Sequence, residues 1–228
     1  MGTGAREHAL VRRLSQDSIP HDLHAAPGNP GMEAHAAIHD VSLGDSAALT
    51  ALALQLGIEL VVIGPEAPLV AGLADDMREA GLTVFGPSKA AAELEGSKDF
   101  AKRIMSEAGV ATARSITVTD PALLEAALDD INPGGSVPYV VKADGLAAGK
   151  GVVVTSSREE ALAHARECLA SGAHGSRVVL EEYLDGPELS VFCVCDGEKA
   201  VPLVPAQDFK RAFKGCLLYT SDAADDMQ

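Results

Sequence analysis

One apolar segment constrains the fold of this chain more than any other feature. Residues 58–63, IELVVI, are almost continuously apolar, and the loop GPEAPL follows them. A run of this kind is typical of a strand buried on both faces of a parallel sheet. Helical patterns lie on either side of it, at 45–55 and 69–80, and a further strand is predicted at 82–85. The alternation predicts a doubly wound α/β domain at the start of the chain.

The first residues depart from that pattern. Residues 6–17 have a helical pattern and 22–26 an extended one, but the chain enters the glycine-rich turn of MGTGAREHAL directly. An α/β domain of this kind normally opens with a buried strand that leads into such a turn. We therefore expect a truncated N-terminus from which this first strand is missing.

A second unit is predicted from about residue 98. Gly-containing turns separate most of its predicted strands, which lie at 115–119, 139–143, 152–155, 177–183, 188–195 and 200–205, and helical patterns lie at 122–130 and 159–169. Strands joined by short turns favour hairpins over crossover connections. The pattern therefore predicts an α+β unit that follows the α/β one.

The charge balance argues against several classes of partner. Eighteen Lys and Arg residues against 33 Asp and Glu give a net charge of −15. A surface for nucleic acid or for an anionic membrane needs net or clustered positive charge, so neither partner is expected. No apolar run approaches the roughly 18–20 residues that span a bilayer. Charged residues interrupt the first stretch of the chain, so no signal peptide is predicted there.

Two of the four cysteines lie close together. Cys193 and Cys195, in VFCVCDG, point to one face if this segment is a strand. They are either a metal or redox pair, or small buried hydrophobic residues in a reduced protein. Because no second pair lies at zinc-ligand spacing, the second interpretation is favoured, and it predicts a cytoplasmic protein.

Three strings carry residues suited to a nucleotide. GTGAREHAL, from Gly2, places glycines at the start of a helix, where backbone N–H groups can approach a phosphate. KADGLAAGKGVVV, from Lys142, delivers a lysine into a loop of small residues that can fold over phosphates. VVLEEYLDGPELSVF, from Val178, ends an apolar strand in two carboxylates. Each string alone has an ordinary alternative: a βα turn, a flexible hairpin and a solvated strand end.

Together the strings resemble the phosphoribosylamine–glycine ligase family, also called glycinamide ribonucleotide synthetase, of the ATP-grasp superfamily. The resemblance runs from Gly2 to about Phe213 and includes APGNPGM, VVIGPEAPLVAGLAD, FGPSKAAAELEGSKDFAK and PLVPAQDFKRAF. It implies a Rossmann-like, pre-ATP-grasp domain over 1–97 and an incomplete ATP-grasp α+β domain over 98–213. The tail 214–228 matches nothing in the family. It resembles translated adapter sequence, and we expect it not to pack.

The resemblance also implies a reaction. ATP, glycine and 5-phosphoribosylamine give glycinamide ribonucleotide, ADP and phosphate through a glycyl phosphate, with Mg²⁺ as the metal. This is a step of purine biosynthesis. Phosphoryl transfer of this kind needs cations on the phosphates more than covalent catalysis.

Site residues follow from the resemblance, position by position. Lys102 and Lys142 match the lysines that hold the ATP phosphates, and Gly145–Gly151, with Gly149 and Lys150, matches the mobile lid. The adenine-facing hinge and the ribose-binding carboxylate are matched by Glu181, Tyr183, Leu184 and Glu188. Parts of the amine-substrate site are matched by Gly4, Arg6, Gly64, Pro65 and Glu66. No catalytic residue is assigned.

Departures from the family pattern limit these expectations. Ala5 replaces a usual Gly, Ala111 a usual Pro and Phe209 a usual His. The metal-binding Glu and Asn of the family lie downstream of Phe213 and are absent, so we expect no metal site and no ligase activity from the chain as written. A non-catalytic nucleotide-binding module, or another ATP-grasp carboxylate–amine ligase or carboxylase, stays an alternative. A nicotinamide dehydrogenase is disfavoured because the third glycine of its fingerprint is missing.

Overall fold

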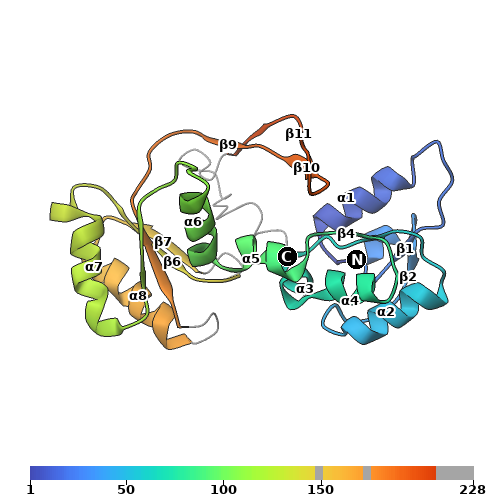
Figure 1. Ribbon diagram of the computed structural model, residues 1–228, viewed down its shortest axis with the longest axis horizontal. Helices are drawn as coiled ribbons and strands as arrows, with labels where there is room; N and C mark the ends of the chain where they lie inside the picture. The colour runs from blue at the N-terminus through green and yellow to red at the C-terminus, as the bar shows by residue number, and fades with distance from the viewer. Residues whose placement is uncertain (147–150, 172–175, 209–228) are drawn as a thin grey trace.

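The computed structural model describes residues 1–146, 151–171 and 176–208. These residues form two units that lie side by side along the longest axis of the molecule (Figure 1). Gly149, Lys150 and the tail 214–228 lie outside the described residues. Among the described helices, none combines the length and the apolar character needed to cross a membrane.

The first unit is built on short parallel strands, as the α/β prediction requires. β1 (His24–Ala25) pairs with β2 (Ala37–Ile38), and β3 (Val61–Val62) pairs with β4 (Val84–Phe85), both in parallel. Residues 1–2 lie between the two pairs. Gly2 N donates to Ala26 O at 3.0 Å, and Gly64 N donates to Met1 O at 3.0 Å. The strand order is therefore β2-β1-(1–2)-β3-β4, a single parallel arrangement.

The helices of this unit cover the strands. They are α1 (Ala5–Leu14), the 3₁₀ turn η1 (Pro30–Met32), α2 (Ser46–Gln55), α3 (Glu66–Ala71), α4 (Leu73–Glu79) and α5 (Lys89–Gly96). Asp45 and Ser88 cap α2 and α5, since their side chains accept from the Ala48 and Ala91 amides. The single helix predicted at 69–80 is wrong. Gly72, with φ +110°, ends α3 in a left-handed conformation and separates it from α4.

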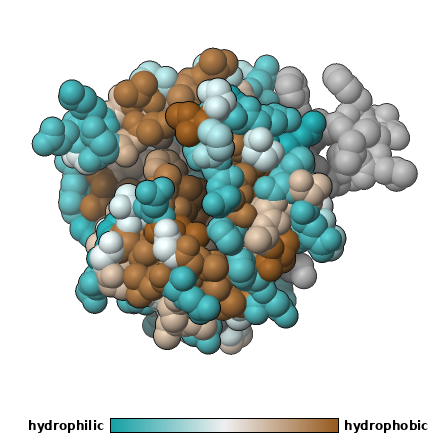
Figure 2. Space-filling view, turned by 90° about the vertical axis from the view of Figure 1, so that its right-hand side faces the viewer, coloured by the Kyte–Doolittle hydropathy of each residue, from teal (hydrophilic) through white to brown (hydrophobic). Residues whose placement is uncertain are grey.

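The core of the first unit is formed by α2 to α5 packed against the strands. Leu49, Leu73, Ala74 and Met77 have at most 2% of their surface exposed. The run 58–63 is only partly as predicted. Val61 and Ile63 are buried, but Leu60 is 57% exposed. Figure 2 shows one end of the molecule, on which apolar side chains gather in patches between polar ones.

The second unit contains a four-stranded antiparallel sheet, which confirms the α+β prediction. Its strands are β5 (Ser115–Val118), β6 (Tyr139–Ala143), β7 (Val152–Thr155) and β8 (Val178–Glu181), in the order β5-β8-β6-β7. The β-branched runs at 139–143 and 152–155 give the two strands that the sequence predicts. The helical elements are α6 (Lys98–Glu107), η2 (Pro121–Leu123), α7 (Leu124–Ile131), η3 (Pro133–Gly135) and α8 (Arg158–Ser171).

The helices α7 and α8 form the core of this unit with the sheet. Leu124 and Leu128 of α7 and Ala161 and Ala165 of α8 are fully or almost fully buried, together with Leu180 of β8. Asp120 caps the start of the helical segment by accepting from the Ala122 amide. The helix α6 is an addition to the prediction. Its N-cap Ser97 follows directly on α5, so the sequence contains no loop to mark its beginning.

A thin arm of short strands follows the sheet (Figure 1). It contains β9 (Glu188–Ser190), β10 (Cys193–Cys195), β11 (Ala200–Pro202) and β12 (Ala206–Asp208), paired as β9 with β12 and β10 with β11. The predicted strand 188–195 is therefore broken in two. The predicted burial of Cys193 and Cys195 is also wrong: both are exposed, because each strand of this arm has one partner strand and, among the described residues, no helix packs on it.

Candidate functional site

Two lysines meet one carboxylate at the end of the antiparallel sheet. Lys142 Nζ lies 2.9 Å from Glu181 Oε2, and Lys102 Nζ lies 3.5 Å from Glu181 Oε1. In the ladder Lys142 is opposite Val179 and Glu181 is opposite Val140, so the two side chains are diagonal neighbours on one face. Lys102 reaches the same carboxylate from α6. The structure thus brings together three of the residues that the resemblance assigns to the nucleotide.

The two lysines differ in how many of their donors are used. Lys102 Nζ also donates to Thr112 Oγ1 at 2.8 Å and to Ala113 O at 2.9 Å, so its three N–H groups all have partners. Within the described part of the chain, the Lys142 ammonium pairs with Glu181 alone. Glu181 supplies one negative charge to two positive ones, which leaves an excess cation. Lys142 is therefore the group best able to take a further anion.

A buried aspartate fixes the start of the loop that follows Lys142. Asp144 is 1% exposed, and its carboxylate accepts from the Ser97 hydroxyl at 3.1 Å and from the Asp99 amide at 3.2 Å. Arg177 Nε lies 3.1 Å from the same carboxylate. The end of β6, the first turn of α6 and the start of β8 are thereby tied together. No role is predicted from the sequence for Ser97, Asp144 or Arg177, although Ser97 lies within ELEGSKDFAK.

The two ends of the predicted lid are held by backbone contacts. Gly145 has φ +101°, and its carbonyl accepts from Lys98 Nζ at 2.8 Å. At the other end, Gly151 O accepts from the Ala143 amide at 2.6 Å. Only Gly145 and Gly151 of the lid residues that were singled out are described.

The predicted hinge and ribose residues are placed less closely together. Tyr183 and Leu184 follow β8 directly, outside any strand, and Leu184 is 66% exposed. Glu188 lies further along, in β9 of the arm, opposite Asp208. Of this group, Glu181 contacts the two lysines.

A second site lies at the start of the chain. A cavity of about 350 Å³ is lined by Gly4, Arg6 and Pro65 together with Thr3, Glu7, Leu43, Gly44, Ala67, Pro68 and Ala71. Its size falls within the range of small-molecule sites. Arg6 donates to both oxygens of Glu66, at 2.7 and 3.2 Å. The predicted Gly4, Arg6, Pro65 and Glu66 are therefore neighbours in space.

Glu7 explains why glycines surround this cavity. Its side chain is buried, and Oε2 accepts from the Gly4 amide at 2.7 Å. A Cβ on Gly64 would lie 2.4 Å from Glu7 Cγ, and one on Gly2 would lie 2.5 Å from it. Only glycine fits at either position. Glu7 is not among the site residues predicted from the sequence.

The Arg6–Glu66 ion pair makes the stability of the fold depend on pH. Burial acts to raise the pKa of Glu66, but the hydrogen bonds from Arg6 and the backbone, with the Arg6 charge, outweigh it, so this pKa is below its ordinary value of 4.5. A carboxyl group with a lowered pKa stabilises the fold above the ordinary value, and this contribution is lost as the pH falls through the folded value.

We therefore predict a pH-dependent effect of Glu66→Gln. The variant should unfold at lower urea concentration than the parent chain near neutral pH, and the difference should shrink on acidification below about pH 4.5. Urea titrations at pH 7, 5 and 3 measure it. A difference that stays constant across this range contradicts the assignment.

Among the described residues, no group of three or more His, Cys, Asp or Glu side chains could hold a metal ion. The residues at Lys102, Lys142 and Glu181 suit an anionic polyphosphate and not a cation. No step is therefore assigned to Mg²⁺ in this chain.

The parallel unit followed by the antiparallel sheet is the architecture of ATP-grasp proteins. Residues 1–95 match the N domain of phosphoribosylglycinamide synthetase, and residues 96–217 match its ATP-grasp (A) domain. The chain belongs to the phosphoribosylglycinamide synthetase family.

Individual relatives agree with this family. The chain is 60% identical over 215 residues to phosphoribosylamine–glycine ligase of Streptomyces coelicolor, covering 94% of this chain and 49% of that protein. It is 53% identical over 216 residues to the enzyme of the same name from Mycobacterium leprae, covering 94% and 50%. The chain thus spans about half the length of the curated relatives it matches.

Solved structures give the same result for the fold. The crystal structure of phosphoribosylamine–glycine ligase from Thermotoga maritima is similar with a TM-score of 0.74 and 33% identity, over 92% of this chain and 49% of that one. N5-carboxyaminoimidazole ribonucleotide synthetase from Thermus thermophilus is similar with a TM-score of 0.63 and 22% identity, over 92% and 52%. The second likeness concerns the fold alone.

Proposed function

We propose that this chain contributes to the ligation of glycine to 5-phosphoribosylamine, which gives glycinamide ribonucleotide, ADP and phosphate. In this reaction ATP phosphorylates the glycine carboxylate, and the amine then displaces phosphate from the glycyl phosphate. The observation that carries the proposal is the cluster of Lys102, Lys142 and Glu181 in a chain of this family. The reaction also implies that the protein acts in the cytoplasm.

The nucleotide site is proposed at the end of the antiparallel sheet. Lys142 binds a phosphate with its unused donors, and Lys102, fixed by Thr112 and Ala113, adds a second positive charge. The segment Gly145–Gly151, with Gly149 and Lys150, covers the phosphates and excludes water, which protects an acyl phosphate from hydrolysis. Adenine lies against Glu181, Tyr183 and Leu184, and Glu188 accepts hydrogen bonds from the ribose. ATP, when bound, supplies the phosphoryl group.

The amine substrate is proposed to bind in the cavity of the first unit. Arg6 uses two donors on Glu66 and retains others for the phosphate of the sugar. Gly4 and Pro65 line the cavity, Glu66 orients Arg6, and Gly64 leaves the space that the Glu7 side chain occupies. The amine-substrate site belongs to a proposed domain over residues 1–97, and the nucleotide site belongs to a proposed domain over residues 98–213.

Joining the chain to a relative's second half tests the proposed reaction. Residues 1–213, fused in frame to the corresponding second half of the Streptomyces coelicolor enzyme, are expected to form glycinamide ribonucleotide. Formation should require ATP, glycine and 5-phosphoribosylamine together, and Lys142→Met in the fusion should abolish most of it. A folded fusion that turns over ATP with another amine or carboxylate, and not with this pair, contradicts the proposal.

A separate prediction concerns Arg6. Arg6→Met should weaken binding of glycinamide ribonucleotide to the chain by about tenfold, because one charge-assisted contact contributes about 1.5–3 kcal/mol and part of it is shared with Glu66. Isothermal calorimetry measures the affinity. The matched control is Arg12→Met, an exposed residue near the end of the same helix, which should bind as the parent does. Equal losses in both variants contradict the assignment.

A further inference from the structure

Ser97 is the single residue between α5 and α6, and it is the N-cap of α6. Its hydroxyl accepts from the Phe100 amide at 3.1 Å and donates to the Asp144 carboxylate at 3.1 Å. Ser97 is 3% exposed and Asp144 is 1% exposed. The Asp99 amide also donates to Asp144, at 3.2 Å. The first turn of α6 is therefore fixed to the residue that directly follows β6.

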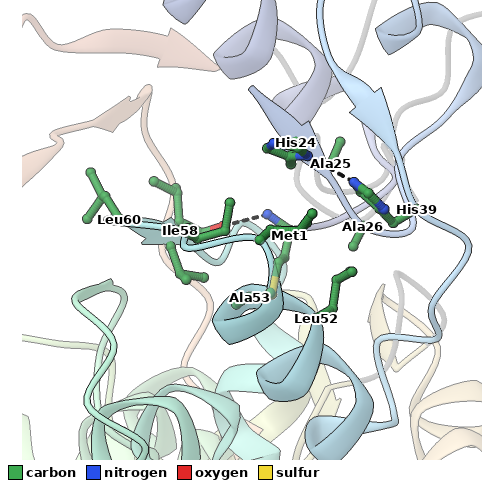
Figure 3. Close-up of a pocket in the computed structure, with 12 residues that line it drawn as sticks. Met1, His24, Ala25, Ala26, His39, Leu52, Ala53, Ile58 and Leu60 are labelled. Atoms are coloured by element: carbon green, nitrogen blue, oxygen red, sulfur yellow. Dashed lines mark hydrogen bonds between the residues drawn. The ribbon is translucent and has the colours of Figure 1, made fainter. Parts of the chain in front are cut away.

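A side-chain contact decides how two elements are placed only where no backbone ladder already holds them. His24 of β1 and His39, just after β2, share a hydrogen bond of 2.9 Å (Figure 3), but the backbones of β1 and β2 are paired in any case. A helix and a strand share no ladder. The placement of α6 against β6 therefore depends on side-chain contacts such as the one between Ser97 and Asp144.

The elements α6 and β6 each carry one lysine of the proposed nucleotide site. Lys142 lies on β6, two residues before Asp144, and Lys102 lies on α6, five residues after Ser97. Both reach Glu181, but unequally: Nζ of Lys142 lies 2.9 Å from the carboxylate, and Nζ of Lys102 lies 3.5 Å from it. A movement of α6 by about 1 Å would break the longer pair, because an ion pair needs its N and O atoms within about 4 Å.

We propose that Ser97 and Asp144 are positioning residues, whose hydrogen bond holds Lys102 at the spacing from Lys142 that lets both ammonium groups bind the phosphates of one nucleotide. The inference rests on the nucleotide site of the proposed function. Both residues act through α6 and its lysine, without contact to the nucleotide. Two cations bind one polyphosphate together only if their separation matches that of the phosphate oxygens, and a buried hydrogen bond fixes that separation in advance.

Ser97→Ala in the full chain tests the proposal by calorimetric titration of ATP. The variant should weaken ATP binding by about fivefold, less than Lys102→Met, which should weaken it by about tenfold or more. The matched control is Ser88→Ala, which removes the equivalent N-cap contact of α5, with the Ala91 amide, and leaves the contacts of Asp144 in place. Ser88→Ala should bind ATP as the parent chain does. Ser97→Thr restores the hydroxyl and should do so too.

A double variant separates positioning from a general loss of stability. In a chain that already carries Lys102→Met, Ser97→Ala has no lysine left to displace and should cause no further loss of ATP affinity. Urea unfolding shows which variants are folded during the titrations. Ser97→Gly removes the same hydroxyl and weakens the cap less than Ser97→Ala does, so it replaces that variant if Ser97→Ala is unfolded.

The possible failures can be told apart. Unchanged ATP affinity in Ser97→Ala, an equal loss in Ser88→Ala, or a further loss when Ser97→Ala is added to Lys102→Met overturns the positioning role alone. A parent chain that binds no ATP overturns the nucleotide site of the proposed function, and the positioning role with it.

Discussion

Replacing Lys142 by methionine is expected to weaken ATP binding by about ten- to a hundredfold while leaving the fold intact. The loss of one charge-assisted contact to phosphate corresponds to about 1.5–3 kcal/mol. Lys142 is the expected phosphate ligand because, among the described residues, its ammonium pairs with Glu181 alone, whereas Lys102 is held by three groups. Methionine keeps the apolar stem that packs on β6. Calorimetric titration of ATP into the two chains measures the change.

The control for this prediction is an exposed lysine of the first unit. Lys89→Met, at the start of α5, changes the net charge equally, and among the described residues Lys89 does not pair with Glu181. It should bind ATP as the parent chain does. If the two variants lose affinity to the same extent, the effect comes from net charge and the assignment of Lys142 is wrong.

Asp144→Ala is expected to destabilise the second unit by about 3 kcal/mol. Removal of a buried carboxylate leaves its partners unsatisfied, and breaking buried pairs costs about 3–5 kcal/mol. Ser97 would lose its acceptor in a buried position, and Arg177, whose side chain is 39% exposed, would regain part of its hydration. The lower end of the range is therefore expected. Urea unfolding followed by circular dichroism measures the difference.

Asp129→Ala is the matched control. Asp129 pairs with Arg158 at 2.9 Å, but its side chain is 65% exposed. Exposed pairs of this kind contribute about 0–1 kcal/mol. A loss in Asp129→Ala as large as that in Asp144→Ala would show that burial and the tie between β6, α6 and β8 are not what stabilises this unit.

Much of the fold could be predicted because local patterns and tertiary packing agree. The β-branched runs that became β6 and β7 have the predicted bounds. Errors arose where a single residue decided the outcome. Gly72 adopts a left-handed conformation that splits one helix into two, and helical periodicity carries no sign of it.

The candidate site could be predicted only in part. Lys102, Lys142 and Glu181 were each singled out through the resemblance, but their contact depends on the register of β6 against β8 and on the placement of α6. Neither can be derived from a local pattern. Asp144 was missed for the same reason, since its partners Ser97 and Arg177 lie far from it in sequence. The exposure of Cys193 and Cys195 depends on what covers the arm, which an apolar run cannot indicate.

The central claim is that ATP places its phosphates at Lys142, and a tagged acyl phosphate of ATP tests it most directly. This reagent transfers its acyl group to a lysine amine beside the terminal phosphate, forms an amide there and releases ATP. Mass spectrometry of the full chain then identifies the labelled lysine. We expect Lys142 to be labelled well ahead of the exposed Lys89 and Lys199, and excess ATP to block that labelling. Labelling of Lys89 and Lys199 at the level of Lys142, or labelling of Lys142 that excess ATP does not reduce, would contradict the account.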